Sequence, residues 1–175
     1  MKTRPFWKII FSAALLIAIG LFFILYFPEL TSKTHRGKSE KIKIARVIDG
    51  DTVVLDNGER VRYIGIDAPE MNFEKEGSAE CFSDEALVRN KELVEGKVVR
   101  LESDLTNRDK YNRLLRYVYL EVDDKEVFVN KVLVEGGYAK TMAISPNLKY
   151  FGELKKAQEE AIRNQRGLWA PGVCK

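Results

Sequence analysis

The sequence predicts an α+β protein in which one apolar helix precedes a small barrel-forming domain. Three observations support this prediction. Residues 9–27 form a run without any charged side chain. Residues 42–175 then read in the order three strands, helix, two strands, helix, helix. The 175 residues are 45% apolar and 31% charged, a composition that excludes a disordered chain.

The apolar run is long enough to cross a bilayer. At 1.5 Å per residue its helix would measure about 29 Å, close to the ~30 Å hydrocarbon core. Trp7 and Tyr26 lie at its two ends, where interfacial aromatic side chains are favoured, and Pro28 follows directly. We therefore expect an uncleaved transmembrane anchor over residues 9–27. A cleaved signal peptide and a buried core helix are the alternatives.

The flanking segments predict the orientation of this anchor. Residues 1–8 carry three cations on a short tail, which is unfavourable to translocate, whereas long domains translocate largely regardless of charge. We expect a cytoplasmic tail and an extracytoplasmic domain, which would be secreted if the anchor were cleaved. Residues 28–41 form a polar linker that holds the only histidine, His35, as a solvated side chain.

The positive charge of the chain belongs to its N-terminal part. Residues 1–41 carry seven Lys or Arg against two Asp or Glu, a net charge of +5. Residues 42–175 carry 22 against 24, a net charge of −2. A domain that grips nucleic acid passively is normally basic itself. Binding of a polyanion here would need a local basic patch or a bound cation.

The first part of the domain predicts three strands. Residues 42–47 alternate in polarity, and residues 52–55 are a β-branched run. The Asn-Gly pair at 57–58 is typical of a two-residue hairpin turn, and residues 60–66 form the return strand. Pro69 ends this strand because it cannot donate to a β-ladder.

The rest of the domain predicts two further strands and three helices. The first helix covers 83–95, with Ser83 as its N-cap and Gly96 just past its end. Strands are expected at 97–101 and 114–122, followed by a turn at 123–124 into the apolar residues 127–129. Helices are expected at 130–135 and 148–166, before an apolar plug at 168–169. Three strands with a helix before the fourth are the layout of an OB-fold barrel. An unrelated small α+β domain is the alternative.

Two carboxylates are expected at the open end of the first hairpin. A two-residue turn at Asn-Gly places Asp51 opposite Ile64, and Asp67 just beyond Ile48. Together with the carbonyl of Ala68 they suit a hard cation such as calcium, which takes six to eight oxygens. The absence of nearby Cys or His in the sequence argues against zinc. Solvated turn residues are the alternative.

Basic residues supply the second chemical pattern. Strand alternation places Arg62 on an apolar face, where a guanidinium needs an anion, either a carboxylate or a bound phosphate. Lys110 and Arg113 flank Tyr111 just before a strand, an arrangement that suits a phosphate chain with a stacked base. A polar loop without function is the alternative for the second group.

Four segments in this order resemble the staphylococcal nuclease family. They are IDGDTV at 48–53, VR at 61–62 together with IDAPE at 66–70, DKYNR at 109–113 and RGLW at 166–169. The resemblance covers roughly residues 42–170. It implies an OB-fold barrel and calcium-dependent hydrolysis of phosphodiester bonds in DNA and RNA that leaves 3′-phosphate ends.

The resemblance also implies a role for each matching position. The catalytic residues would be Arg62, Glu70 and Arg113; the calcium ligands Asp51, Asp67 and the carbonyl of Ala68; and the substrate contacts Lys110 and Tyr111. Asp49 would bond calcium-bound water. The loop at 141–146 lacks a tyrosine that the family offers there and is about one residue shorter, which leaves base preference open.

Two cysteines remain, Cys81 and Cys174. Their separation excludes a CxxC redox pair and a zinc ribbon. In an exported domain an even number of cysteines favours one disulfide, and two unpaired thiols are the alternative. We expect a monomeric domain, with no protein partner evident. A non-catalytic OB-fold module that binds nucleic acid or protein is the alternative function, and a membrane-tethered component of DNA uptake would be compatible with nuclease activity.

Overall fold

The computed structural model describes residues 39–71 and 79–174. The predicted tail and anchor, and the linker up to residue 38, lie outside these residues. Within the described ranges no helix has both the length and the apolar character needed to span a bilayer. The predicted anchor at 9–27 therefore stays a prediction.

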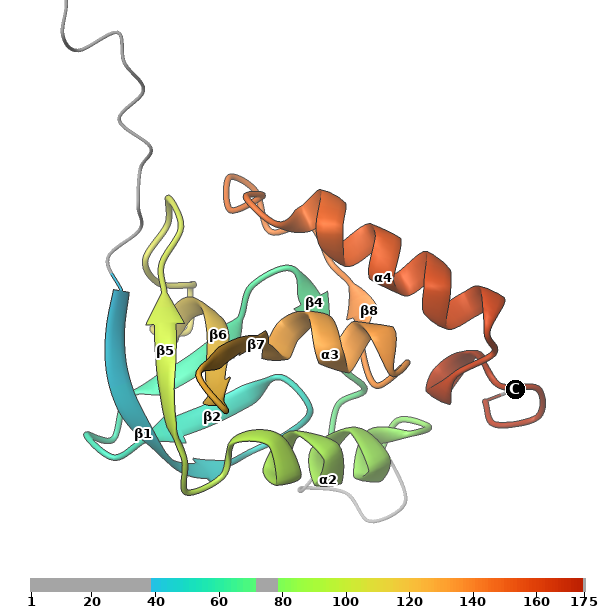
Figure 1. Cartoon of the computed structure of the whole chain (residues 1–175), viewed down its shortest axis with the longest axis horizontal. Helices are drawn as coiled ribbons and strands as arrows, with labels where there is room; N and C mark the ends of the chain where they lie inside the picture. The colour runs from blue at the N-terminus through green and yellow to red at the C-terminus, as the bar shows by residue number, and fades with distance from the viewer. Residues whose placement is uncertain (1–38, 72–78, 175) are drawn as a thin grey trace, which may run out of the picture. The chain divides into compact units, whose positions relative to one another are not determined.

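Five strands close into a barrel (Figure 1). They are β1 (Ser39–Val47), β2 (Thr52–Leu55), β3 (Arg60–Tyr63), β5 (Val98–Glu102) and β6 (Leu114–Val122). The antiparallel order is β3-β2-β1-β5-β6, and a parallel pairing of β3 with β6 completes the ring. This arrangement fits the predicted OB-fold. β1 begins three residues before the predicted strand, because Ser39 already pairs with Glu102.

The register of the first hairpin differs from the prediction by one residue. Thr52 pairs with Arg62, and Asp51 accepts a backbone hydrogen bond from Tyr63 rather than facing Ile64. The reason lies in the turn, where only Gly58 has a positive φ (84°). A two-residue type I′ turn needs positive φ at both central positions, so the chain forms a three-residue loop instead. Asp51 still lies at the open end of the hairpin.

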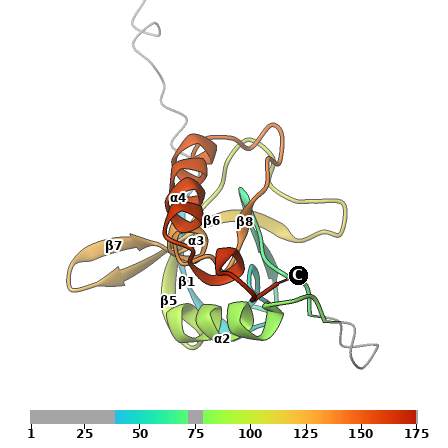
Figure 2. The ribbon, with the colours of Figure 1, turned by 90° about the vertical axis from the view of Figure 1, so that its right-hand side faces the viewer.

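Two smaller pairings surround the barrel. Strand β7 (Lys125–Phe128) pairs with the second half of β6 through a turn at Asp123 and Asp124, both with positive φ, and this hairpin projects to one side in Figure 2. Strands β4 (Ile66–Asp67) and β8 (Lys140–Thr141) form a separate two-stranded sheet. The sequence did not predict β8. Its pairing partner is the strand that carries Asp67, so it supports the site described below.

Helices cover the barrel. They are α2 (Ser83–Val94), α3 (Val129–Glu135) and α4 (Phe151–Arg163), followed by the short 3-10 helix η2 (Gly167–Trp169). α4 is shorter at both ends than predicted. Buried apolar side chains from the barrel strands meet those of α2, α3 and α4 in one core that includes Val53, Leu101, Val94, Leu133 and Leu154. The half-buried η2 occupies the place predicted for the apolar plug.

The start of α2 differs from the prediction. Ser83 is the first residue of the helix and is buried, so it does not act as the N-cap. Phe82 takes that position with φ 72°, and its ring packs 5.7 Å from the ring of Tyr138. The preceding Cys81 forms a disulfide with Cys174, as predicted. The crosslink and the ring contact together set the direction in which the chain enters the helix.

Candidate active site

The centre of the candidate site is an arginine held by two aspartates. Arg62 on β3 is 5% exposed, and its guanidinium pairs with Asp51 and, at 2.6 Å, with Asp67. Asp51 is buried, whereas the Asp67 side chain is 48% exposed. The sequence left open whether Arg62 meets a carboxylate or a phosphate, and the structure provides two carboxylates. Both carboxylates therefore contact the same guanidinium, and the cluster reaches solvent through the Asp67 side chain.

A tight turn between β1 and β2 positions the first aspartate. The N–H of Asp51 donates to Asp49 Oδ1 (2.9 Å), and Asp51 Oδ2 accepts from the N–H of Ala68 (2.7 Å). A Cβ on Gly50 would lie 2.5 Å from the Cβ of Ala68 and 2.9 Å from that of Ala86, so this approach of turn, β4 and α2 requires glycine. The turn consequently locks the two aspartate-bearing segments together.

Asn90 on α2 supports the same turn and was missed in the sequence. It is fully buried, its Nδ2 donates to the carbonyl of Asp49 (2.9 Å), and its Oδ1 accepts from the Tyr63 hydroxyl (3.1 Å). A polar side chain at a core position of the predicted helix was the available signal.

Burial raises the pKa of the Asp49 carboxyl, while the charge of Arg62 opposes this rise.

Glu70 lies at the surface beside this cluster. Its side chain is exposed, yet partial desolvation raises the pKa of its carboxyl, and the negative charge of Asp49 adds to the rise. Arg62 and Arg113 act in the opposite direction. These interactions place Glu70 within the electrostatic reach of both predicted catalytic arginines.

The loop before β6 carries the second arginine. Arg113 Nε donates to Asp109 Oδ2 (2.7 Å), and Asp109 Oδ1 accepts from the N–H groups of Tyr111 and Arg113 (both 2.9 Å). Although burial opposes it, hydrogen bonding from Arg113 lowers the pKa of Asp109. Tyr111 is 60% exposed, with Lys110 Nζ 4.9 Å and Arg113 Cζ 5.4 Å from its ring centre. The loop therefore presents an exposed aromatic ring next to two cations.

The donor set suits a hard cation only in part. Asp51 and Asp67 both pair with Arg62, so a bound cation would compete with this guanidinium for the same two carboxylates. Across residues 39–71 and 79–174, however, no group of three or more His, Cys, Asp or Glu side chains is arranged to hold a metal. Calcium takes six to eight oxygens. Two carboxylates and one carbonyl would leave most positions to water or substrate.

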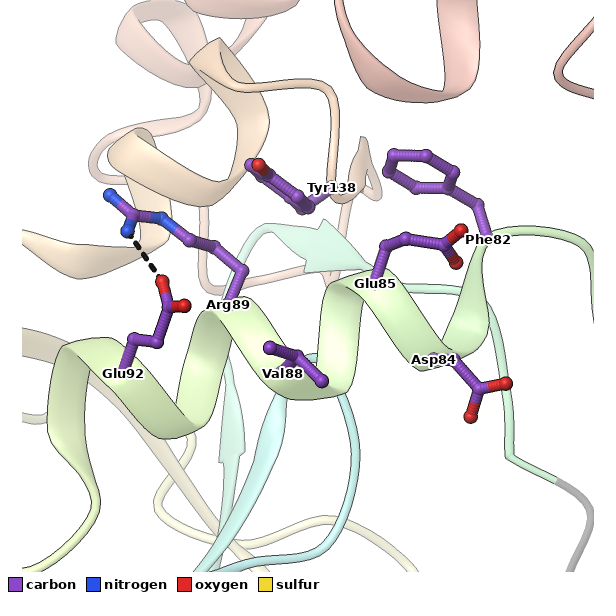
Figure 3. A pocket seen from close by; sticks show the side chains of 7 residues that line it. All are labelled: Phe82, Asp84, Glu85, Val88, Arg89, Glu92 and Tyr138. Carbon is purple, nitrogen blue, oxygen red and sulfur yellow. Dashed lines mark hydrogen bonds and ion pairs between the residues drawn. The ribbon is translucent and has the colours of Figure 1, made fainter.

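A separate groove runs along α2, away from these residues. It measures about 410 Å³ and lies between the helix and the aromatic pair Phe82 and Tyr138 (Figure 3). Asp84, Glu85 and Glu92 from α2 line it, with Arg89 paired to Glu92. None of the predicted site residues lines this groove.

Comparison with known proteins bears on this arrangement. The model of the family described as "Staphylococcal nuclease homologue" matches residues 60–171, well over half of the chain. The chain belongs to the staphylococcal nuclease family. Membership agrees with the closed barrel, and with the order of the segments that carry Arg62, Glu70 and Arg113.

Several relatives within this family align along most of the chain. A thermonuclease of Staphylococcus hyicus is 31% identical, covering 97% of this chain and 99% of the relative. A thermonuclease of Staphylococcus intermedius is 35% identical, covering 93% and 98%. The endonuclease YncB of Bacillus subtilis (strain 168) is 35% identical, covering 81% and 69%. The similarity to the two thermonucleases thus extends over nearly their whole length.

Proposed function

We propose that this chain is a calcium-dependent nuclease that hydrolyses phosphodiester bonds in DNA and RNA and leaves 3′-phosphate ends. The observation that carries the proposal is the pairing of the buried Arg62 with Asp51 and Asp67, within electrostatic reach of Glu70. Membership of the family, and relatives named thermonuclease and endonuclease, support it.

Glu70 is the candidate base. Its exposed carboxylate would orient or deprotonate a water molecule that attacks phosphorus, and the P–O5′ bond then breaks to give a 3′-phosphate and a 5′-hydroxyl. General-base assistance of this kind contributes about 10²–10⁴ to a rate. The raised pKa of Glu70 favours this role, because a base is more effective when its pKa lies nearer the working pH.

The two arginines would stabilise the charge that develops on the phosphoryl oxygens. Asp109 holds Arg113 through its Nε at 2.7 Å, so this arginine needs little reorganisation when substrate binds. Arg62 would exchange its contacts with Asp51 and Asp67 for the phosphate when calcium occupies those carboxylates. Preorganised donors of this kind contribute about 10²–10³ each. Lys110 would add a phosphate contact.

Asp51, Asp67 and the carbonyl of Ala68 would hold the calcium ion, and Asp49 would accept a hydrogen bond from its water. Bound calcium would supply a Lewis acid at the scissile phosphate. The domain has a net charge of −2, so attraction for a polyanion has to be local. The Tyr111 ring, flanked by Lys110 and Arg113, offers such a surface for a stacked base.

We further propose that residues 9–27 anchor the protein in a membrane, with the nuclease domain outside the cytoplasm. The uncharged run supports the anchor, and the disulfide supports an oxidising compartment. Protease added to intact cells should digest the domain. A domain that survives until the membrane is lysed would contradict this orientation.

The nuclease activity is tested with the full chain in mild detergent. DNA and RNA cleavage should be fast with calcium and absent with a calcium chelator. Magnesium should support less turnover, because it demands octahedral geometry at about 2.0–2.1 Å and gives up its water reluctantly. Full activity in the chelator would falsify the metal mechanism. DNA binding without cleavage under every metal would favour the alternative of a binding module.

A variant separates chemistry from binding. Glu70→Gln should lower turnover by about 10²–10⁴ while calcium and DNA affinity stay near normal. Glu85→Gln, at an exposed position on α2, is the matched control and should leave turnover unchanged. Equal turnover in the two variants would remove Glu70 from the reaction.

A further inference from the structure

The backbone of Glu70 is hydrogen-bonded to Glu80, which lies just before α2. The N–H of Glu80 donates to the carbonyl of Glu70 (3.1 Å), and the N–H of Glu70 donates to Glu80 Oε2 (3.2 Å). Both peptide groups that flank the Glu70 Cα are thereby fixed. Because the backbone sets the direction of the Cα–Cβ bond, these two bonds restrict the positions that the Glu70 carboxylate can reach.

Glu80 itself is anchored on its C-terminal side. The next residue, Cys81, is joined by a disulfide to Cys174, 93 positions further along the chain. The carbonyl of Glu80 accepts from the N–H of Ser83 (3.1 Å), and Ser83 is buried at the start of α2. Glu80 therefore sits between a covalent crosslink and a helix that packs on the core.

The hydrogen bonds alone are weak anchors. Glu70 and Glu80 are both exposed, and an exposed hydrogen bond contributes little net stability because water competes for the same groups. Such bonds persist when their partners are held in place by something else. The disulfide provides this restraint, since it limits the conformations open to the residue beside it.

We propose that Glu80 is a positioning residue for the Glu70 carboxylate, and that the Cys81–Cys174 disulfide fixes Glu80, so that the oxidised chain is the more active nuclease. This inference rests on the proposed function of Glu70. Reduction by a dithiol transfers two electrons and two protons to the bond between Cys81 and Cys174. Two cysteine thiols form, and the dithiol becomes a cyclic disulfide.

The first test uses the full chain in detergent with its disulfide intact. Glu80→Ala removes the acceptor of the Glu70 N–H and should lower kcat about tenfold with KM for DNA unchanged, because small misplacements of a reacting group carry losses of this order. Glu80→Gln keeps an acceptor oxygen and should restore most of kcat. Glu85→Ala, on the exposed face of α2, is the matched control and should leave kcat unchanged.

A double substitution distinguishes positioning from a general structural effect. In a Glu70→Gln background, Glu80→Ala should lower the residual kcat no further, because the carboxylate through which it acts is already absent. A second tenfold loss in that background would overturn the proposal. So would a Glu80→Ala chain that cleaves DNA at the normal rate.

Reduction provides the second test. The wild-type chain treated with a dithiol should lose about tenfold in kcat and regain it on reoxidation, with circular dichroism reporting that it is folded at the assay temperature. Cys81→Ser combined with Cys174→Ser should show the lower kcat and no response to dithiol. A reduced, folded chain with unchanged kcat would contradict the role of the disulfide.

Amide hydrogen exchange tests the same inference without activity. The Glu70 amide should exchange slowly in the oxidised chain and about tenfold faster after Glu80→Ala or after reduction. Unchanged exchange in Glu80→Ala would overturn the positioning role. If the oxidised wild type cleaves no substrate with any metal, the proposed function fails, and this exchange measurement still decides whether Glu80 and the disulfide hold Glu70.

Discussion

Replacing Glu102 by glutamine should destabilise the folded protein by about 3 kcal/mol at pH 7. The Glu102 side chain, at the end of β5, is 8% exposed. Its carboxylate accepts hydrogen bonds from Arg100 Nη1 (3.0 Å), Lys149 Nζ (2.5 Å) and the Tyr150 hydroxyl (3.0 Å). The last two donors directly precede α4, so this one carboxylate joins the barrel to the C-terminal helix.

The magnitude follows from which donors lose their partner. A hydrogen bond to a charged group is worth about 1.5–3 kcal/mol, and breaking a buried ion pair costs about 3–5 kcal/mol. Arg100 keeps a second partner in Glu126, and the Lys149 side chain is 38% exposed, so both can be solvated or paired again. The expected loss is therefore near the lower end of the range for a buried pair.

The effect should depend on pH. Although burial opposes it, hydrogen bonds from Lys149, Arg100 and Tyr150 lower the pKa of Glu102 below its ordinary value of 4.5. A lowered folded-state pKa means that the stabilisation is fully present above the unfolded-state pKa and is lost as the pH falls through the folded-state value. The stability difference between wild type and Glu102→Gln should accordingly shrink below pH 4.5.

Urea denaturation at a series of pH values measures this difference. Glu126→Gln is the matched control, because Glu126 pairs with the same Arg100 but its side chain is 52% exposed. An exposed pair contributes about 0–1 kcal/mol, so the control should lose little stability. Equal losses in the two variants, or a Glu102→Gln loss that does not change with pH, would refute the reasoning.

Three further predictions concern the site and its scaffold. Arg62→Lys should lower turnover about 10²-fold with the fold intact, because an ammonium cannot reproduce the planar guanidinium fork; near-normal steady-state turnover would make Arg62 structural. Gly50→Ala should lower the free energy of unfolding, measured by thermal denaturation, by about 1–3 kcal/mol, because its Cβ would lie 2.5 Å from the Cβ of Ala68. Gly152→Ala is the control: its Cβ would have no atom within 4 Å, so it should be neutral or stabilising. Replacing Cys81 and Cys174 by serine should cost up to about 4.7 kcal/mol for a loop of this length, and an unchanged urea midpoint would contradict it.

The sequence predicted correctly those strands whose own residues carry a clear hydrophobic or β-branched pattern. The β-branched run of β2 and the long run of β6 begin and end where the sequence indicated. Strand β8 escaped prediction because two residues, Lys140 and Thr141, have no periodicity of their own and exist as a strand only through β4. The hairpin register shifted because Gly58 alone, rather than Asn57 with it, has a positive φ.

In the candidate site, too, some features could be predicted from local sequence and others depend on tertiary contacts. Arg62 and its need for an anion could be predicted, since a guanidinium on an apolar face is unusual, but the choice between two aspartates and a phosphate depends on tertiary packing. The contacts of Asn90 with Asp49 and Tyr63 join residues far apart in the chain, so no local pattern contains them. No local pattern predicted the contact between Glu80 and Glu70 either, because polar residues such as these are common in any loop.

The parallel pairing of β3 with β6 has a consequence for the timing of activity. It places Arg62 beside Leu115, two residues after Arg113, and so joins two arginines that are 51 positions apart in the chain. Pairings between distant segments form late in folding, because the loop between them must close first. In a chain that is still unfolded, on the ribosome or while crossing a membrane, the site residues would all be present but not yet brought together. We therefore expect nuclease activity to arise together with ring closure, and an unfolded precursor to leave nucleic acid intact.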